Sequence, residues 1–149
     1  MIALFVEAWD ANKERLREYF KTHKMEEYST YKQLVRVLFD DVINPYLEEV
    51  KGIIPYDVRD EEITVIDNGN YQGTQLFALH KETYQPSAWE YVLTHQYYGS
   101  CSGCDTLMGI TENWEDRLPN DEQVEMFITL CFHLLQRCTI PYGYYCDED

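Results

Sequence analysis

The hydrophobic period of the chain changes twice, and this change constrains the fold more than any single motif. Apolar residues recur every three or four positions over residues 2–22 and again from about residue 29 to residue 52, which predicts two helices. Residues 61–67, 71–81 and 88–98 instead alternate with a period of two, and each segment predicts a strand. The helical period returns at residues 104–111 and again after residue 120.

The short links between the three predicted strands fix how they pair. The Asn-Gly pair at residues 68–69 favours a tight turn, and parallel strands would need long crossovers, so we expect an antiparallel meander. The predicted order is α-α-β-β-β-α-α, an α+β fold in which the three-stranded sheet packs against helices. The 149 residues show no linker and no repeat, so we expect residues 1–149 to form one domain.

Single residues refine the helix boundaries. Pro45 should kink or restart the second helix, because it has no backbone N–H to donate, and Gly52 should end it. Asn120 and Gln123 have the spacing of a capping box at the start of the last helix. Pro141 should mark the end of that helix.

Acidic side chains are in large excess, and most of the excess lies after residue 51. The chain has 12 Lys and Arg against 27 Asp and Glu, a net charge of −15. Residues 1–51 carry 8 basic and 10 acidic side chains, whereas residues 52–149 carry 4 and 17. Such a surface repels nucleic-acid phosphates and anionic lipid and attracts cations. We therefore expect a basic protein as partner and no direct binding to nucleic acid or membranes; a surface that serves only solubility is the alternative.

The cellular compartment follows from what the sequence lacks. No segment approaches the roughly 20 apolar residues of a membrane-spanning helix, and the first ten residues have no basic region typical of a secretory signal. We expect a cytoplasmic protein with reduced thiols. Its five cysteines, an odd number, favour free thiols or a metal site over a disulfide framework. Cys131 and Cys138 lie on the apolar stripe of the last predicted helix and are interpreted as core residues.

The segment G-S-C-S-G-C-D at residues 99–105 is the least ordinary part of the chain. Cys101 and Cys104 have the spacing of half a zinc site, for which Cys146 and one histidine would be the further ligands. The same C-x-x-C at a helix start also favours a reactive thiolate and disulfide exchange. Glycines and serines equally suit a tight structural turn. The sequence leaves these three interpretations open.

Three segments resemble a known group of proteins. Residues 97–107 (YYGSCSGCDTL), 67–73 (DNGNYQG) and 121–137 (DEQVEMFITLCFHLLQR) resemble small phage and prophage-associated proteins of unassigned function. The resemblance covers about half of the chain and is strongest at the G-S-C-S-G-C-D segment. It implies an origin in a phage or mobile element, and it implies neither a reaction nor catalytic residues.

The charge and the resemblance together favour a non-enzymatic interaction protein. Its negative surface would imitate nucleic acid and inhibit a nucleic-acid-binding host protein, as some anti-CRISPR and restriction-inhibiting proteins do. A zinc-binding or redox-active thiol protein that uses the Cys101–Cys104 loop is the alternative. An enzyme of unknown class is a third possibility, although no G-x-S-x-G, Walker or H-E-x-x-H motif occurs. Nothing in the sequence indicates an oligomeric state.

The predicted site residues are therefore partner contacts and not catalytic groups. We expect no cofactor unless the thiols hold zinc, for which Cys101, Cys104 and Cys146 are the candidate ligands. The candidate contacts are acidic side chains and one tyrosine: Asp57, Asp60, Glu61, Glu62, Tyr98, Asp105, Glu115, Asp116, Asp121 and Glu122, together with the acidic tail at 147–149.

Overall fold

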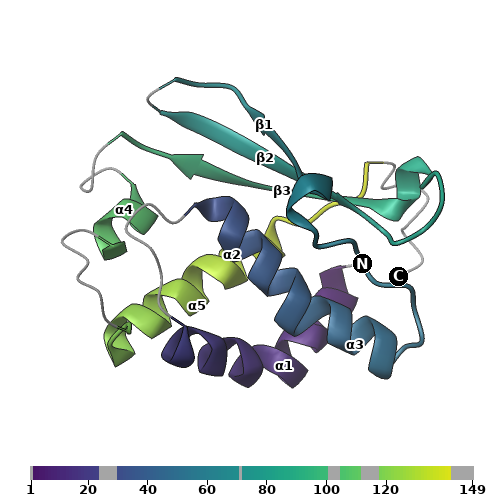
Figure 1. Ribbon diagram of the computed structural model, residues 1–149, viewed down its shortest axis with the longest axis horizontal. Helices are drawn as coiled ribbons and strands as arrows, with labels where there is room; N and C mark the ends of the chain where they lie inside the picture. The colour runs from purple at the N-terminus through teal and green to yellow at the C-terminus, as the bar shows by residue number, and fades with distance from the viewer. Residues whose placement is uncertain (1, 24–29, 71, 101–104, 112–117, 142–149) are drawn as a thin grey trace.

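The computed structural model describes residues 2–23, 30–70, 72–100, 105–111 and 118–141. Helices α1 (Ile2–Thr22), α2 (Tyr31–Leu38) and α3 (Asn44–Glu49) precede strands β1 (Thr64–Asp67), β2 (Gly73–His80) and β3 (Tyr91–Tyr98). Helices α4 (Thr106–Thr111) and α5 (Asp121–Gln136) follow the strands (Figure 1). The predicted α+β fold with a three-stranded antiparallel sheet is confirmed.

The second predicted helix is one helical run that Pro45 interrupts. A π-helical segment, η1 (Phe39–Ile43), joins α2 to α3, and Pro45 lies in the first turn of α3, where a missing N–H is tolerated. The buried Asn44 side chain holds the chain beyond the run, because its amide donates to the Tyr56 carbonyl (2.8 Å) and accepts from the Tyr56 N–H (2.9 Å). Gly52 has a positive φ of 63° after the last turn, as expected of a helix stop.

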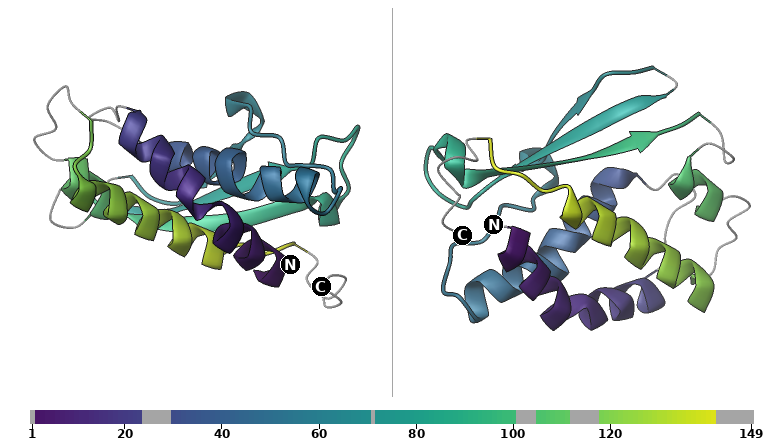
Figure 2. Two further views of the ribbon diagram at one scale, coloured as in Figure 1. Left: turned by 90° about the horizontal axis from the view of Figure 1, so that it is seen from below. Right: turned by 180° about the vertical axis from the view of Figure 1, so that it is seen from behind.

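The sheet has the strand order β1-β2-β3, with antiparallel pairing throughout. One face carries Phe77, Leu79 and Val92, which are fully buried. The long helices all lie on this side of the sheet, as the views in Figures 1 and 2 show. The residues between these positions along each strand point to the opposite face of the sheet.

Strands β1 and β3 each begin three residues later than their sequence pattern predicts. The segments before β1 and β3 form short 3₁₀ helices instead, η2 (Asp60–Glu62) and η3 (Ala88–Glu90). A capping box between Ser87 and Glu90 fixes η3, because each side chain accepts a hydrogen bond from the other residue's backbone N–H. Local capping therefore wins over the alternating pattern at the start of β3.

Helix α5 lies between the sheet and α1 and supplies much of the core. The Phe127 ring stacks on Phe20 of α1, with ring centroids 5.0 Å apart. The buried Thr94 hydroxyl of β3 donates to the Leu134 carbonyl at 2.6 Å. The buried apolar residues form one cluster that joins the sheet and the helices. No helix in the described part of the chain has the length and apolar composition needed to cross a bilayer.

The start of α5 agrees with its predicted capping box, whereas its end does not lie near Pro141. The Asn120 side chain accepts from the Gln123 N–H at 2.8 Å, and the Gln123 side chain accepts from the Asn120 N–H at 2.9 Å. The helix stops at Gln136, because the chain then turns to pair with the sheet. Thr139 and Leu93 exchange two backbone hydrogen bonds there, at 2.7 and 2.8 Å.

Candidate functional site

Acidic side chains gather where β1 begins, β2 ends and β3 begins. The segment before β1 is tied to the end of β2, because the Asp57 N–H donates to the His80 carbonyl (2.7 Å) and Tyr56 pairs with Lys81. The Lys81 N–H in turn donates to the Glu90 carbonyl at 2.9 Å. These contacts define the acidic end of the sheet, which comprises Asp57, Arg59, Asp60, Glu61, Glu62, His80, Lys81, Glu82 and Glu90.

Asp57 is the buried centre of this region. Its side chain is closed off from solvent, and only 4% of the residue is exposed. The Arg59 guanidinium donates to both carboxylate oxygens, at 2.7 Å from Nη2 and 3.0 Å from Nε, and the Arg59 N–H adds a third contact at 3.0 Å. The guanidinium hydrogen bonds hold the pKa of Asp57 below its usual value. The charge of Asp57 is therefore neutralised internally and is not presented to a partner.

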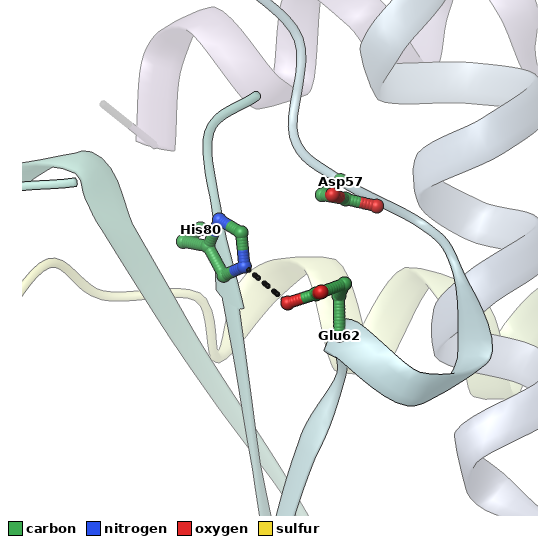
Figure 3. Close-up of side chains that lie close together, drawn as sticks. All are labelled: Asp57, Glu62 and His80. Atoms are coloured by element: carbon green, nitrogen blue, oxygen red, sulfur yellow. Dashed lines mark hydrogen bonds and ion pairs between the residues drawn. The ribbon is translucent and has the colours of Figure 1, made fainter. Parts of the chain in front are cut away.

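His80 and Glu62 form a second pair beside Asp57 (Figure 3). The His80 Nε2 lies 3.0 Å from the Glu62 carboxylate, and its Nδ1 lies 2.9 Å from the Lys81 carbonyl oxygen. Both partners accept hydrogen bonds, so the doubly protonated ring satisfies both. Burial by itself would lower the pKa of His80, but the bonds to Lys81 and Glu62 and the nearby carboxylates raise it. The pair with Glu62 therefore favours the protonated form of His80.

Asp57, Glu62 and His80 are also side chains of the types that bind metal ions, and among the described residues they lie close enough together to share one. One ligand atom from each of Asp57, Glu62 and His80 lies within 4.8 Å of the others. A histidine whose Nδ1–H is fixed by a carbonyl also has the orientation found in metal ligands. However, Asp57 is already paired with Arg59, and Glu62 is paired with His80. The geometry is that of an ion-paired cluster that fixes the ends of the hairpin.

The remaining carboxylates of the acidic end face outward. Asp60 is 3.2 Å from the Lys32 ammonium, in an exposed ion pair that solvent screens. Glu61 and Glu82 are exposed, and neither has an ion pair with another described residue. The Glu90 carboxylate accepts a hydrogen bond from the Ser87 backbone N–H, and this bond holds the pKa of Glu90 below its usual value. The outward charge is therefore carried by Asp60, Glu61 and Glu82.

Tyr98 and Asp105 lie at the other end of the sheet, and Asp105 is not a surface residue. Only 5% of Asp105 is exposed, and its carboxylate accepts from the Tyr31 hydroxyl (2.9 Å) and from the Gly99 N–H (2.8 Å). The Tyr98 hydroxyl donates to Asp67 at 2.6 Å. The prediction that Asp57 and Asp105 contact a partner is corrected by their burial, because both carboxylates are used within the fold.

Asp121 and Glu122 are exposed in the first turn of α5, where they favour the positive end of the helix dipole. This turn lies apart from η2 in each view of the molecule (Figures 1 and 2). Glu122 also lines a groove of about 420 Å³ along α5, in which Glu125 and Arg137 place opposite charges. These two predicted contacts therefore do not join the acidic end.

The thiol hypothesis rests largely on positions that the structure does not describe. The candidate ligands Cys101, Cys104 and Cys146 lie outside the described residues, as do Glu115, Asp116 and the tail at 147–149. Cys131 and Cys138 are described, and both are buried in the core, as predicted. Burial raises the pKa of Cys131 far above its usual range and that of Cys138 to about 12, so neither is a ready thiolate.

His80 is the site residue that the sequence did not single out, because its pairing with Glu62 depends on the register of the hairpin. The register pairs Thr64 with Ala78 and Asp67 with Gln75, so extending the same hairpin by two further pairs places Glu62 opposite His80. A histidine facing an acid across a hairpin forms an ion pair. The Asn-Gly pair alone would have set another register, because a two-residue turn at residues 68–69 pairs Asp67 with Asn70, whereas the structure pairs Asp67 with Gln75.

The chain matches no protein-family model, no curated protein and no solved structure.

Proposed function

We propose that this chain is a non-enzymatic, cytoplasmic interaction protein of phage or mobile-element origin, and that it binds a basic host protein through the acidic end of the sheet. The partner would be a nucleic-acid-binding protein, whose basic groove the carboxylates occupy in place of phosphates. The origin is supported by the resemblance of residues 97–107 to phage-associated proteins. The mode of action is supported by the charges described below.

The observation that carries the proposal is that the basic side chains of the acidic end are engaged within the fold, whereas several of its carboxylates are exposed. The acidic end contains six Asp and Glu side chains against two Lys and Arg side chains. Both basic groups are engaged within the fold, since Arg59 is held by Asp57 and the Lys81 ammonium lies 5.6 Å from the centre of the Tyr56 ring. The exposed carboxylates Glu61 and Glu82 face solvent beside them. The region is thus negative toward an approaching partner.

The geometry favours binding over catalysis at this position. Both ring nitrogens of His80 are occupied by hydrogen-bond acceptors, so the ring is not placed to take a proton from a substrate. Asp57 is buried and paired with Arg59. The groups that remain accessible are single carboxylates, which suit ionic contact with Lys and Arg side chains.

The test captures partners from a bacterial host lysate on the immobilised protein and then adds duplex DNA. The account predicts that DNA displaces the retained protein and that added salt releases it, because both compete for the same ionic contacts. The acidic-end variant Glu61→Gln/Glu82→Gln should retain less of that protein. The matched control Asp10→Asn/Glu18→Gln changes the charge equally on exposed positions of α1 and should retain as much as the unchanged protein.

Retention that neither DNA nor salt reduces, and that is equal in both variants, would reject charge mimicry at the acidic end.

A further inference from the structure

The loop between β2 and β3, residues 81–90, is anchored at both ends and exposes an aromatic side chain to solvent. Its first residues are anchored, because the Glu82 N–H donates to the Pro55 carbonyl (3.0 Å) and the Thr83 N–H to the Lys81 carbonyl (2.8 Å). At its other end, the Glu90 carboxylate accepts from the Ser87 N–H at 3.0 Å and from the Thr83 hydroxyl at 3.2 Å. The loop is therefore closed on itself by its own side chains.

The residues between these anchors are unusually exposed. Tyr84 has 91% of its surface in solvent, and Trp89 in η3 has 56%. Gln85 adopts a positive φ of 48°, which is uncommon for a residue with a side chain and costs roughly 1–3 kcal/mol. An exposed aromatic ring on a constrained loop loses little conformational freedom when it binds, which is why Tyr and Trp dominate binding hot spots.

The negative charge around these rings favours a positively charged partner. Glu82 lies two residues before Tyr84, and it is exposed together with Glu61 and Asp60 at the acidic end. The positive group of this loop, Lys81, is directed toward the Tyr56 ring. A second copy of the chain, with its own net charge of −15, would be repelled from such a surface.

Among cationic side chains, arginine fits this combination better than lysine. The planar guanidinium can stack on an aromatic face and at the same time donate to a carboxylate, whereas an ammonium is a compact and strongly hydrated charge. We propose that the 81–90 loop binds an arginine of the basic partner, with Tyr84 stacking on the guanidinium and Glu82 accepting its hydrogen bonds. This inference rests on the proposed function, because it names the chemistry that the acidic end recognises.

The experiment measures the dissociation constants of an oligoarginine and an oligolysine of equal length by fluorescence anisotropy at low salt. The quantity of interest is the ratio of the two constants, because general attraction to the negative surface acts on both peptides. Tyr84→Leu keeps an apolar side chain without the aromatic face and should reduce the preference for arginine by about two- to fivefold. Tyr84→Phe keeps the face and should retain the preference.

Circular dichroism checks that the variants fold, which the exposure of Tyr84 leads us to expect. If both peptides bind through Glu61 and Glu82 but the ratio is the same in Tyr84→Leu as in the unchanged protein, this inference is wrong and the proposed function stands. If neither peptide binds, or if binding is indifferent to Glu61→Gln/Glu82→Gln, the proposed function fails, and the assignment of the loop fails with it.

Discussion

The buried carboxylate of Asp105 is predicted to be the strongest single polar contribution to the fold at the far end of the sheet. Its Oδ1 accepts from the Tyr31 hydroxyl (2.9 Å) and the Met108 N–H (3.1 Å), and its Oδ2 accepts from the Gly99 N–H (2.8 Å). The Tyr31 hydroxyl also accepts from the Leu107 N–H at 3.1 Å. One carboxylate therefore caps α4 and ties its start to Gly99 after β3 and to Tyr31 of α2.

The cost of Asp105→Ala can be estimated from these contacts. Loss of a helix cap costs about 1 kcal/mol, and each buried donor left without an acceptor costs about 1–3 kcal/mol. Gly99 and Tyr31 are both buried, so two donors lose their acceptor. The free energy of unfolding should fall by about 3–7 kcal/mol, a large share of the roughly 5–15 kcal/mol typical of a domain.

Urea unfolding followed by circular dichroism measures this loss. Asp105→Asn keeps one acceptor oxygen and should cost less, about 1–2 kcal/mol. Tyr31→Phe combined with Asp105→Ala should cost less than the sum of the two single changes, because both remove the same hydrogen bond. A loss below about 1 kcal/mol in Asp105→Ala, or full additivity of the pair, would refute the role assigned to this carboxylate.

Three other perturbations have defined outcomes. Burial opposes the shift, but the hydrogen bonds to Lys81 and Glu62 raise the pKa of His80, so its contribution to the free energy of unfolding is complete below its ordinary pKa of 6.5 and is lost as the pH rises through the higher folded value. The free energy of unfolding measured in urea should therefore fall with rising pH more in the unchanged protein than in His80→Gln, and parallel profiles would contradict this. Asn44→Ala removes two buried hydrogen bonds to Tyr56 and should lower the free energy of unfolding by about 2–4 kcal/mol in the same assay, whereas a loss under about 1 kcal/mol would show that the contacts contribute little. Cys131 and Cys138 should resist iodoacetamide in the folded protein and react in urea, as peptide mass spectrometry can follow, and equal labelling in both states would disprove their burial.

The sequence allowed much of the fold to be predicted, because local signals carry it. The capping box at Asn120 depends on four consecutive residues, and the helix interruption at Pro45 depends on one missing N–H. The antiparallel meander follows from the period of two and the short links between strands. The strand starts were predicted too early, because the Ser87–Glu90 cap converts part of an alternating pattern into a 3₁₀ turn.

The site was less predictable, because its chemistry depends on which side chains meet. Asp57 and Asp105 are acidic in the sequence but are buried by contacts with Arg59 and with Tyr31, which lies 74 residues earlier than Asp105 in the chain. The pairing of Asp105 with so distant a residue cannot be read from composition, and neither can the burial of Asp57, whose partner Arg59 is only two residues away. The exposure of Tyr84 also needed the structure, since aromatic residues are commonly buried.

The central claim is that the acidic end of the sheet binds a positively charged partner, and the salt dependence of oligoarginine binding tests it most directly. The account predicts that the dissociation constant rises steeply between about 50 and about 200 mM salt. It also predicts that Glu61→Gln/Glu82→Gln binds roughly two- to thirtyfold more weakly at low salt and has a shallower salt dependence, whereas Asp10→Asn/Glu18→Gln behaves as the unchanged protein does. Binding that is independent of salt, or that both double variants weaken equally, would contradict the claim.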